Sequence, residues 1–271
     1  MIINGSDILI QINEDSILKI AEQNANNRNC ISHYTSLETL KLIFTDKTLK
    51  FNRIDQVNDK KEKNFFENDE LSNLVYVSCF TYNINESIPM WKIYGKNDNG
   101  VRISFTFNES NPEKYLFDEQ GETINPTNAV IHRCEKSNIP NCDWYYTVNC
   151  KDVIYDISEI EKNPIRRKES KTGKEIFNLS AMGAIKRKEW EYEHETRFIA
   201  YLRTTRDNVV IPDIKFFLVP IKFDYIKAIT ITFNPWMSDD VKVEIKQFMY
   251  SIKFQNKVIL RFEDSILSGE I

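Results

Sequence analysis

The stretch from residue 31 to residue 44 reads Ile-Ser-His-Tyr-Thr-Ser-Leu-Glu-Thr-Leu-Lys-Leu-Ile-Phe. Its first residues, 31–34, predict a short strand, and Thr35 with Glu38 three positions later matches the capping box that starts a helix. Apolar residues then recur at spacings of three and four, which predicts one buried helix face. The first unit of the fold is therefore a strand that passes directly into a helix.

Beyond this unit, the pattern predicts more strands than helices. Strand-like runs occupy residues 49–54, 74–80, 100–107, 130–133, 196–202, 216–223, 228–233 and 258–262. In residues 100–107 apolar and polar side chains alternate, which is typical of a half-buried strand. Helices are predicted over 89–94, 174–188 and 239–251, and the charged segment 55–70 is expected to be loop and exposed helix. Because strands and helices do not alternate strictly, we expect an α+β fold with a mixed or antiparallel sheet and flanking helices.

Composition indicates one folded unit. The 271 residues are 41% hydrophobic and include 17 Phe, 12 Tyr and 4 Trp, enough to bury a sizeable core. A net charge of −4 gives no general attraction to nucleic acid or to an anionic membrane. With no signal peptide and no apolar run long enough to span a bilayer, we expect a cytoplasmic protein without a membrane partner.

Cysteines and glycines exclude several kinds of site. Five cysteines at irregular spacings favour reduced thiols over a disulfide framework. A zinc site built from His132, Cys134, Cys142 and Cys150 is weakly supported, since no Cys-x-x-Cys pair occurs, and no metal is expected. The seven glycines are too dispersed for a P-loop or a Gly-x-Gly-x-x-Gly turn.

The first candidate site residues are His33, Tyr34 and Thr35. They stand where the predicted strand meets the helix, and a helix N-terminus favours negatively charged groups such as a diphosphate. The competing interpretation is that His33 hydrogen-bonds inside the core and that Thr35 only caps the helix. The residues alone do not decide between the two.

A second candidate stretch runs from Ser78 to Tyr94. Ser78 belongs to a predicted buried strand, and Trp91 and Tyr94 lie three apart on the following helix, where flat rings suit a flat ligand. Aromatic residues at helical spacing are, however, more often part of a core.

The third candidate is the sequence Glu193-His194-Glu195-Thr196-Arg197. If it enters a strand, Glu193, Glu195 and Arg197 project from the same face. Two adjacent carboxylates can divide roles, because like charges at close range separate their pKa values. The alternative is a solvated strand face with surface ion pairs. The charge runs 166–168 and 186–188 are expected to be solvated as well, although either could contact a phosphate.

Taken in order, these motifs resemble domain-of-unknown-function family 2971. That bacterial family has a His-Tyr-Thr start, a Met-Trp helix and a Trp-x-x-Glu-x-Glu-x-Arg strand, matched here by residues 33–35, 90–91 and 190–197. The resemblance spans roughly residues 31–266, so we expect one domain over 1–271, with residues 1–30 as an N-terminal extension.

The family in turn resembles the ADP-ribosyltransferase fold, whose split sheet holds NAD in a cleft. This resemblance implies that Glu195 is the catalytic glutamate and that Glu193 assists it as in a Glu-x-Glu pair. It also implies that NAD, as substrate, contacts residues from all three stretches: His33, Tyr34, Thr35, Ser78, Trp91, Tyr94 and Arg197. The chain lacks the first-motif arginine of arginine-directed transferases, so the acceptor stays open between protein and nucleic acid.

The expected function is therefore NAD-dependent transfer of ADP-ribose to a macromolecule, with a toxin or antiphage effector as a possible role. The alternatives are an NAD glycohydrolase, which uses water as the acceptor, and a non-catalytic domain that binds a nucleotide or nucleic acid. The physical argument for catalysis is that breaking the nicotinamide–ribose bond develops positive charge, which a fixed carboxylate stabilises. The sequence leaves the oligomeric state undetermined.

Overall fold

A mixed sheet of nine strands forms the centre of the computed structural model, which describes residues 2–3, 8–11, 16–59, 62, 69–96, 98–117, 144–156, 166–168, 175–178, 181–204, 209–210, 213–254 and 256–269. The strands of this sheet are β3 (Cys30–Ser36), β4 (Thr48–Arg53), β5 (Val75–Thr81), β6 (Gly100–Phe107), β7 (Trp144–Asp152), β10 (Glu195–Thr204), β12 (Phe216–Pro220), β13 (Ile226–Phe233) and β14 (Ile259–Glu263).

The sheet divides beside β5. One part has the order β12-β4-β5-β10-β7 and the other the order β3-β6-β13-β14. β5 pairs with β10 along its whole length but with β3 at a single register position, Ser32 opposite Thr81. Within the sheet β13 and β14 are parallel and the other neighbours are antiparallel. The predicted α+β class with a mixed sheet and flanking helices is confirmed.

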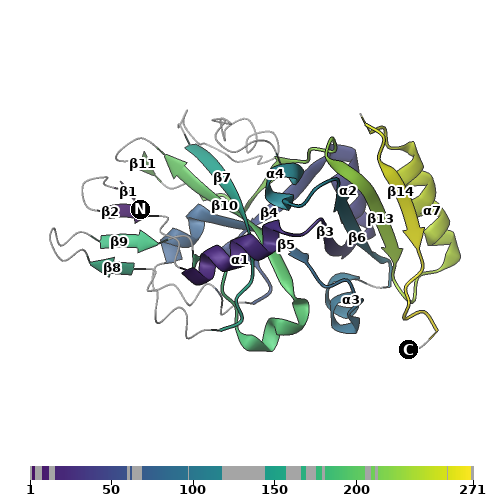
Figure 1. Cartoon of the computed structure of the whole chain (residues 1–271), viewed down its shortest axis with the longest axis horizontal. Helices are drawn as coiled ribbons and strands as arrows, with labels where there is room; N and C mark the ends of the chain where they lie inside the picture. The colour runs from purple at the N-terminus through teal and green to yellow at the C-terminus, as the bar shows by residue number, and fades with distance from the viewer. Residues whose placement is uncertain are drawn as a thin grey trace.

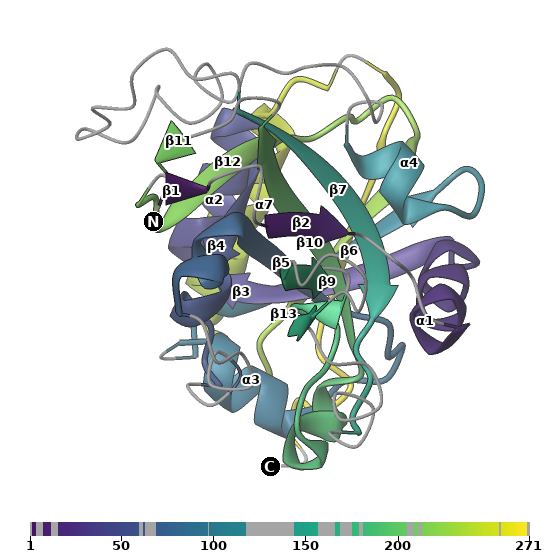
Figure 2. The same ribbon diagram turned by 90° about the vertical axis from the view of Figure 1, so that its left-hand side faces the viewer.

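Helices cover the sheet and close its edges. They are α1 (Ser16–Asn26), α2 (Leu37–Asp46), α3 (Ile88–Tyr94), α4 (Pro112–Leu116) and α7 (Asp239–Ser251). α1 packs on β7, as Figure 2 shows, while α2 contacts β3, β4, β6 and α7. α7 and β14 lie together at one end of the molecule (Figure 1). At the other end lie two small sheets, one of β1 (Ile2–Ile3) and β11 (Val209–Val210), and one of β2 (Ile8–Gln11), β8 (Arg166–Lys168) and β9 (Glu175–Asn178).

The strand-to-helix unit has its predicted form, with one change in the cap. β3 continues to Ser36, whose hydroxyl accepts a hydrogen bond from the Thr39 amide, so Ser36 is the N-cap of α2. Thr35, the predicted cap, is still within the strand and pairs with Val101 of β6. The helix begins one residue later than a Thr35 cap predicts, because the sheet ladder holds Thr35 in an extended conformation.

One prediction of local structure was wrong. The described residues of 174–188 do not form a helix: β9 pairs in parallel with β2, and Gly183 lies in a turn with a φ of +80°, which is incompatible with a helix. In β6 the predicted alternation holds, since Ser104 and Thr106 are half-buried between buried apolar residues, and only Arg102 departs from it with 7% exposure. The strand expected over 130–133 lies outside the described residues.

Candidate functional site

A pocket opens where β3 and β5 diverge. It encloses roughly 330 Å³ of empty space, including the solvent at its mouth. Residues of all three candidate stretches line it: Ser32, His33, Tyr34, Cys79, Phe80, Thr81, Met90, Tyr94, Glu193 and Glu195. The predicted site residues His33, Tyr34, Tyr94, Glu193 and Glu195 therefore meet in one place.

His33 forms one wall of the pocket from β3. Its Nδ1 lies 2.7 Å from the carbonyl oxygen of Cys79, on the strand from which β3 has separated. Because a carbonyl oxygen only accepts, Nδ1 carries the hydrogen of this bond. Burial lowers the pKa of His33, and the bond to Cys79 only partly opposes this effect. The imidazole is therefore neutral near pH 7, and its Nε2 is available as an acceptor.

The two glutamates reach the pocket by different routes, contrary to the prediction that both project from one strand face. Glu193 ends a 3₁₀ helix over Lys188–Glu193, His194 takes a left-handed conformation with φ of 42°, and Glu195 begins β10. The turn at His194 replaces the expected two-residue alternation. Both glutamates are buried, since Glu193 is 2% exposed and Glu195 is 3% exposed. They therefore do not belong to a solvated strand face.

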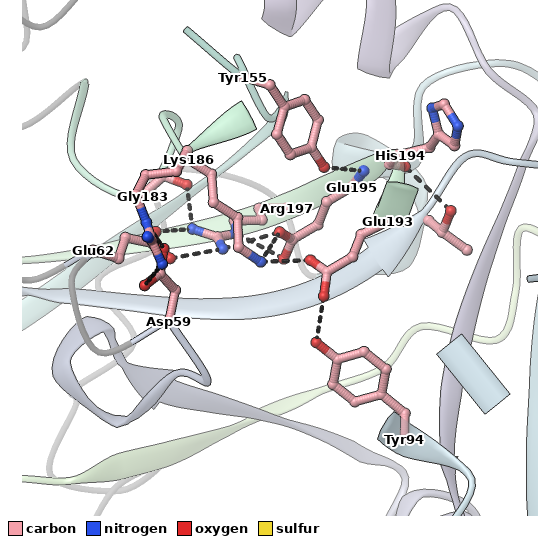
Figure 3. A network of polar contacts seen from close by, with 12 residues as sticks. Asp59, Glu62, Tyr94, Tyr155, Gly183, Lys186, Glu193, His194, Glu195 and Arg197 are labelled. Carbon is pink, nitrogen blue, oxygen red and sulfur yellow. Dashed lines mark hydrogen bonds and ion pairs between the residues drawn. The ribbon is translucent and has the colours of Figure 1, made fainter. Parts of the chain in front are cut away.

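Lys186 joins the two carboxylates. Its Nζ lies 2.5 Å from Oε2 of Glu193 and 3.2 Å from Oε2 of Glu195. The sequence placed Lys186 in a solvated charge run, but it is 3% exposed. Figure 3 shows its ammonium between the glutamates and next to the guanidinium of Arg197.

Arg197 lies behind Glu195 and has all of its donors satisfied within the protein. Its Nε and Nη2 donate to Glu195 at 2.7 and 3.0 Å, and Nη1 donates to the Gly183 carbonyl at 2.9 Å. Nη1 and Nη2 also donate to Glu62. Arg197 was expected to contact the cofactor, yet it is fully buried and does not line the pocket. Its contacts instead hold Glu195 in place.

The segment after β4 is buried at two positions, which corrects the prediction that residues 55–70 are loop and exposed helix. Glu62 is 0% exposed and Asp59 is 3% exposed. Asp59 accepts two hydrogen bonds from Arg187, at 2.9 and 3.1 Å. Asp59 thus attaches this segment to Arg187, and Glu62 attaches it to Arg197.

The environments of the two site glutamates separate their pKa values. For Glu193, burial and then the charge of Glu195 raise the pKa, against the opposing effect of Lys186. For Glu195, burial also acts to raise the pKa, but Arg197 and Lys186 outweigh it and lower the pKa to about 2. Glu195 is therefore ionised at neutral pH, and Glu193 is the member of the pair with the higher proton affinity.

The aromatic residues divide between the pocket and the core behind it. The Tyr94 hydroxyl donates to Oε1 of Glu193 at 2.7 Å, so Tyr94 is part of the site. Trp91 is 1% exposed and packs edge-on against Tyr34, with ring centroids 4.8 Å apart. Its Nε1 donates to Glu86 at 2.8 Å. Trp91 does not line the pocket, but it supports Tyr34 and Met90, which do.

Thr35 and Ser78, also expected at the site, are buried in their strands and do not line the pocket. On β5 the lining residues are Cys79, Phe80 and Thr81. The Cys79 thiol donates to Glu195, which helps to lower the pKa of that carboxyl. Sequence reasoning missed Cys79, Lys186 and Glu62. Only the apolar residues Ala184 and Ile185 immediately before Lys186 signalled its burial.

The described residues contain neither a metal site nor a membrane-spanning helix. Across the part of the chain that the structure describes, no group of three or more His, Cys, Asp or Glu side chains is placed to hold a metal ion. His132, Cys134 and Cys142, considered for zinc, lie outside the described residues. None of the described helices is long and apolar enough to cross a membrane.

Solved structures with some likeness to the chain include forms of DarT from Thermus sp. 2.9. The form in complex with NAD+ has a TM-score of 0.32 and 9% identity, covering 87% of this chain and 95% of that one. The form in complex with ADP-ribosylated ssDNA has a TM-score of 0.31 and 10% identity, covering 86% and 94%. TM-scores this low do not support a transfer of residue roles.

A search of curated proteins finds no match to the chain. Comparison with protein families gives a positive result. Residues 90–198, which include the Met-Trp helix and the Glu-x-Glu-x-Arg motif, match the family described as "Protein of unknown function (DUF2971)". The family expected from the three motifs is therefore the one that this chain matches.

Proposed function

We propose that the pocket binds NAD, cleaves its nicotinamide–ribose bond and transfers ADP-ribose to a macromolecular acceptor. The observation that carries this proposal is the convergence of His33 with Glu193 and Glu195 in one pocket. The neutral imidazole of His33, whose Nε2 accepts hydrogen bonds, lies on one wall of the pocket, and two carboxylates of different proton affinity lie on the other. These are the groups that the reaction needs.

The charge of the site favours a cationic substrate. When ionised, Glu62, Glu193 and Glu195 carry three negative charges, against two positive charges on Lys186 and Arg197. In a buried network, the excess negative charge is stabilised by a proton or by a cation in the pocket. The nicotinamide ring of NAD is positively charged, and the positive charge moves to the ribose as the bond breaks.

Glu195 and Glu193 have separate roles in this reaction. The bond between the nicotinamide nitrogen and the ribose carbon breaks, and nicotinamide leaves as a neutral molecule with both bonding electrons. Glu195, which is held ionised and fixed by Arg197, stabilises the positive charge on the ribose. Glu193, with its raised pKa, accepts the proton that the acceptor loses when its oxygen or nitrogen bonds to the ribose carbon.

The remaining walls suit the neutral parts of NAD. Nε2 of His33 is an acceptor for a ribose hydroxyl. Tyr34, Phe80 and Met90 provide apolar surface for a flat ring. Because Glu193 and Glu195 line this pocket, we place the nicotinamide riboside half of NAD here.

Incubation with NAD labelled in the adenosine half tests the proposal. Label transferred to protein or nucleic acid supports a transferase. Free ADP-ribose alone identifies the NAD glycohydrolase instead, and NAD binding without turnover identifies a non-catalytic domain. A protein that does not bind NAD at all would contradict the proposal.

The variant that tests the role of Glu195 is Glu195→Gln, because it keeps the size of the side chain and removes its charge. We expect a loss of turnover of at least roughly 100-fold, the size of a lost electrostatic contribution. Glu191→Gln is the control, since Glu191 belongs to the same segment but is exposed. Equal turnover in the two variants would contradict the assignment of Glu195. A cytoplasmic location and a toxin or antiphage role stay predictions.

A further inference from the structure

Lys186 occupies a position that the reaction proposed above does not explain. It belongs to none of the three motifs, it is buried, and its ammonium contacts both site carboxylates. It does not line the pocket, so it has no contact with a substrate there. Any effect of Lys186 on the reaction must therefore act through Glu193 and Glu195.

The surroundings of Lys186 hold the ammonium in one place. The ring of Trp190 lies 4.5 Å from Nζ, in cation–π contact, and is itself stacked on Tyr192. The backbone of the segment is also fixed, since the Lys186 amide donates to the Ile154 carbonyl at 2.9 Å and Arg187 is bound to Asp59. The Trp of the Trp-x-x-Glu-x-Glu motif therefore covers the ammonium that the two glutamates share.

The two contacts of Lys186 are unequal. Glu193 is the nearer carboxylate, and among the described residues Lys186 is the cation that contacts it, with no guanidinium beside it. Glu195 has Arg197 in addition. Without Lys186, the two carboxylates would lie close together with no ammonium between them, and only Glu195 would keep a cation, Arg197. Two such carboxylates would share a proton.

We propose that Lys186 is a positioning residue that holds Glu193 and Glu195 side by side and keeps Glu193 able to release a proton at neutral pH. The inference rests on the proposed function and deepens it. Glu193 is the proton acceptor of that reaction, and Lys186 keeps it ionised. Other groups that face the pair are Tyr94 from α3, Cys79 from β5, Glu62 from the segment after β4, Tyr155 after β7, Arg197 from β10, and His33 and Tyr192. Lys186→Met leaves all of these in place.

The test is a carboxyl titration that requires no activity. The ¹³C signals of Glu193 and Glu195 are followed against pH in the whole protein without NAD, and Glu193→Gln and Glu195→Gln assign them. In Lys186→Met we expect the pKa of Glu193 to rise by about 1–3 units, the usual effect of losing an adjacent opposite charge. Lys186→Arg is expected to restore most of the wild-type titration.

Lys188→Met is the control, because Lys188 is an exposed neighbour in the same segment. Its two glutamate titrations are expected to equal those of the wild type. A Glu193 titration in Lys186→Met that equals the Lys188→Met titration would overturn the proposal.

Lys186→Gln keeps the test available if Lys186→Met does not fold, because its neutral amide can still donate a hydrogen bond to Glu193. The pKa of Glu193 is expected to rise in this variant as well. A Glu193 titration in Lys186→Gln that equals the Lys188→Met titration would also overturn the proposal. If the wild type turns over NAD, the acid limb of its pH profile moves to higher pH in Lys186→Met. If it does not, the proposed function fails, while the titration still decides the role of Lys186.

Discussion

Replacing Arg197 with methionine removes the cation that two buried carboxylates share. Arg197 is fully buried, and it donates to both Glu62 and Glu195. Removing one partner of a buried ion pair costs about 3–5 kcal/mol, because the remaining charge is left uncompensated. Since Glu62 loses its guanidinium partner and Glu195 keeps only Lys186, we expect the upper end of this range, about 5 kcal/mol. At roughly 2–4 °C of Tm per kcal/mol for a chain of this size, Tm falls by roughly 10–20 °C.

Thermal unfolding followed by circular dichroism at pH 7 measures this change. Lys41→Met is the control, because the Lys41–Glu244 pair has a similar length of 2.5 Å but is 40% and 52% exposed, and exposed pairs contribute about 0–1 kcal/mol. The difference between Arg197→Met and wild type is expected to shrink as the pH falls, because protonated carboxyls need no cation. A Tm for Arg197→Met no lower than that of Lys41→Met would refute this account of the network.

Three other predictions follow from the site. The pKa of Glu195 is lowered to about 2, below its ordinary value of 4.5, so its contribution to stability is present above about pH 4.5 and is lost as the pH falls towards 2; in acid unfolding, the stability of Glu195→Gln should depend less on pH across this window. His33→Asn keeps a donor for the Cys79 carbonyl but lacks Nε2, and its Kd for NAD by calorimetry is expected to rise about 10-fold with little change in Tm. Glu86 accepts hydrogen bonds from Trp91 Nε1, Ser265 Oγ and the Ile266 amide, so Glu86→Gln, which has only one acceptor oxygen, should lower the free energy of unfolding by about 1–3 kcal/mol in urea titrations. An unchanged urea midpoint would show that these bonds do not stabilise the fold.

Periodic patterns in the sequence predicted seven of the other strands of the central sheet besides β3 and the helices α2, α3 and α7, but not β7 or α1. The helix over residues 239–251 has the predicted bounds, because Asp239 and Asp240 mark its start and its apolar residues recur at helical spacing. The helix predicted over 174–188 failed because its apolar residues at three-residue spacing also fit a strand, a turn and a bridge. Pairing of β9 with β2, far away in the chain, decided between these outcomes.

The candidate site was predicted in part. The motifs located His33, Tyr34, Tyr94, Glu193 and Glu195, because histidines and paired glutamates are recognisable where they stand in a sequence. Lys186, Glu62 and Cys79 were missed because little in the local sequence distinguishes a buried polar side chain from a solvated one. The burial of Glu62 depends on Arg197, 135 positions away in the chain. Such contacts emerge only when the sheet is assembled.

The narrow junction between β3 and β5 affects how the pocket responds to change elsewhere. Ser32 opposite Thr81 is the one register pair that joins these strands, and the His33 side chain makes the next link, to the Cys79 carbonyl. Few main-chain hydrogen bonds therefore join the two halves of the sheet beside the pocket, and the side chains of their shared core fix the angle between them. The width of the pocket depends on the packing of both halves. Substitutions at the outer strands β7 or β14 are expected to alter substrate affinity without touching any residue that lines the pocket.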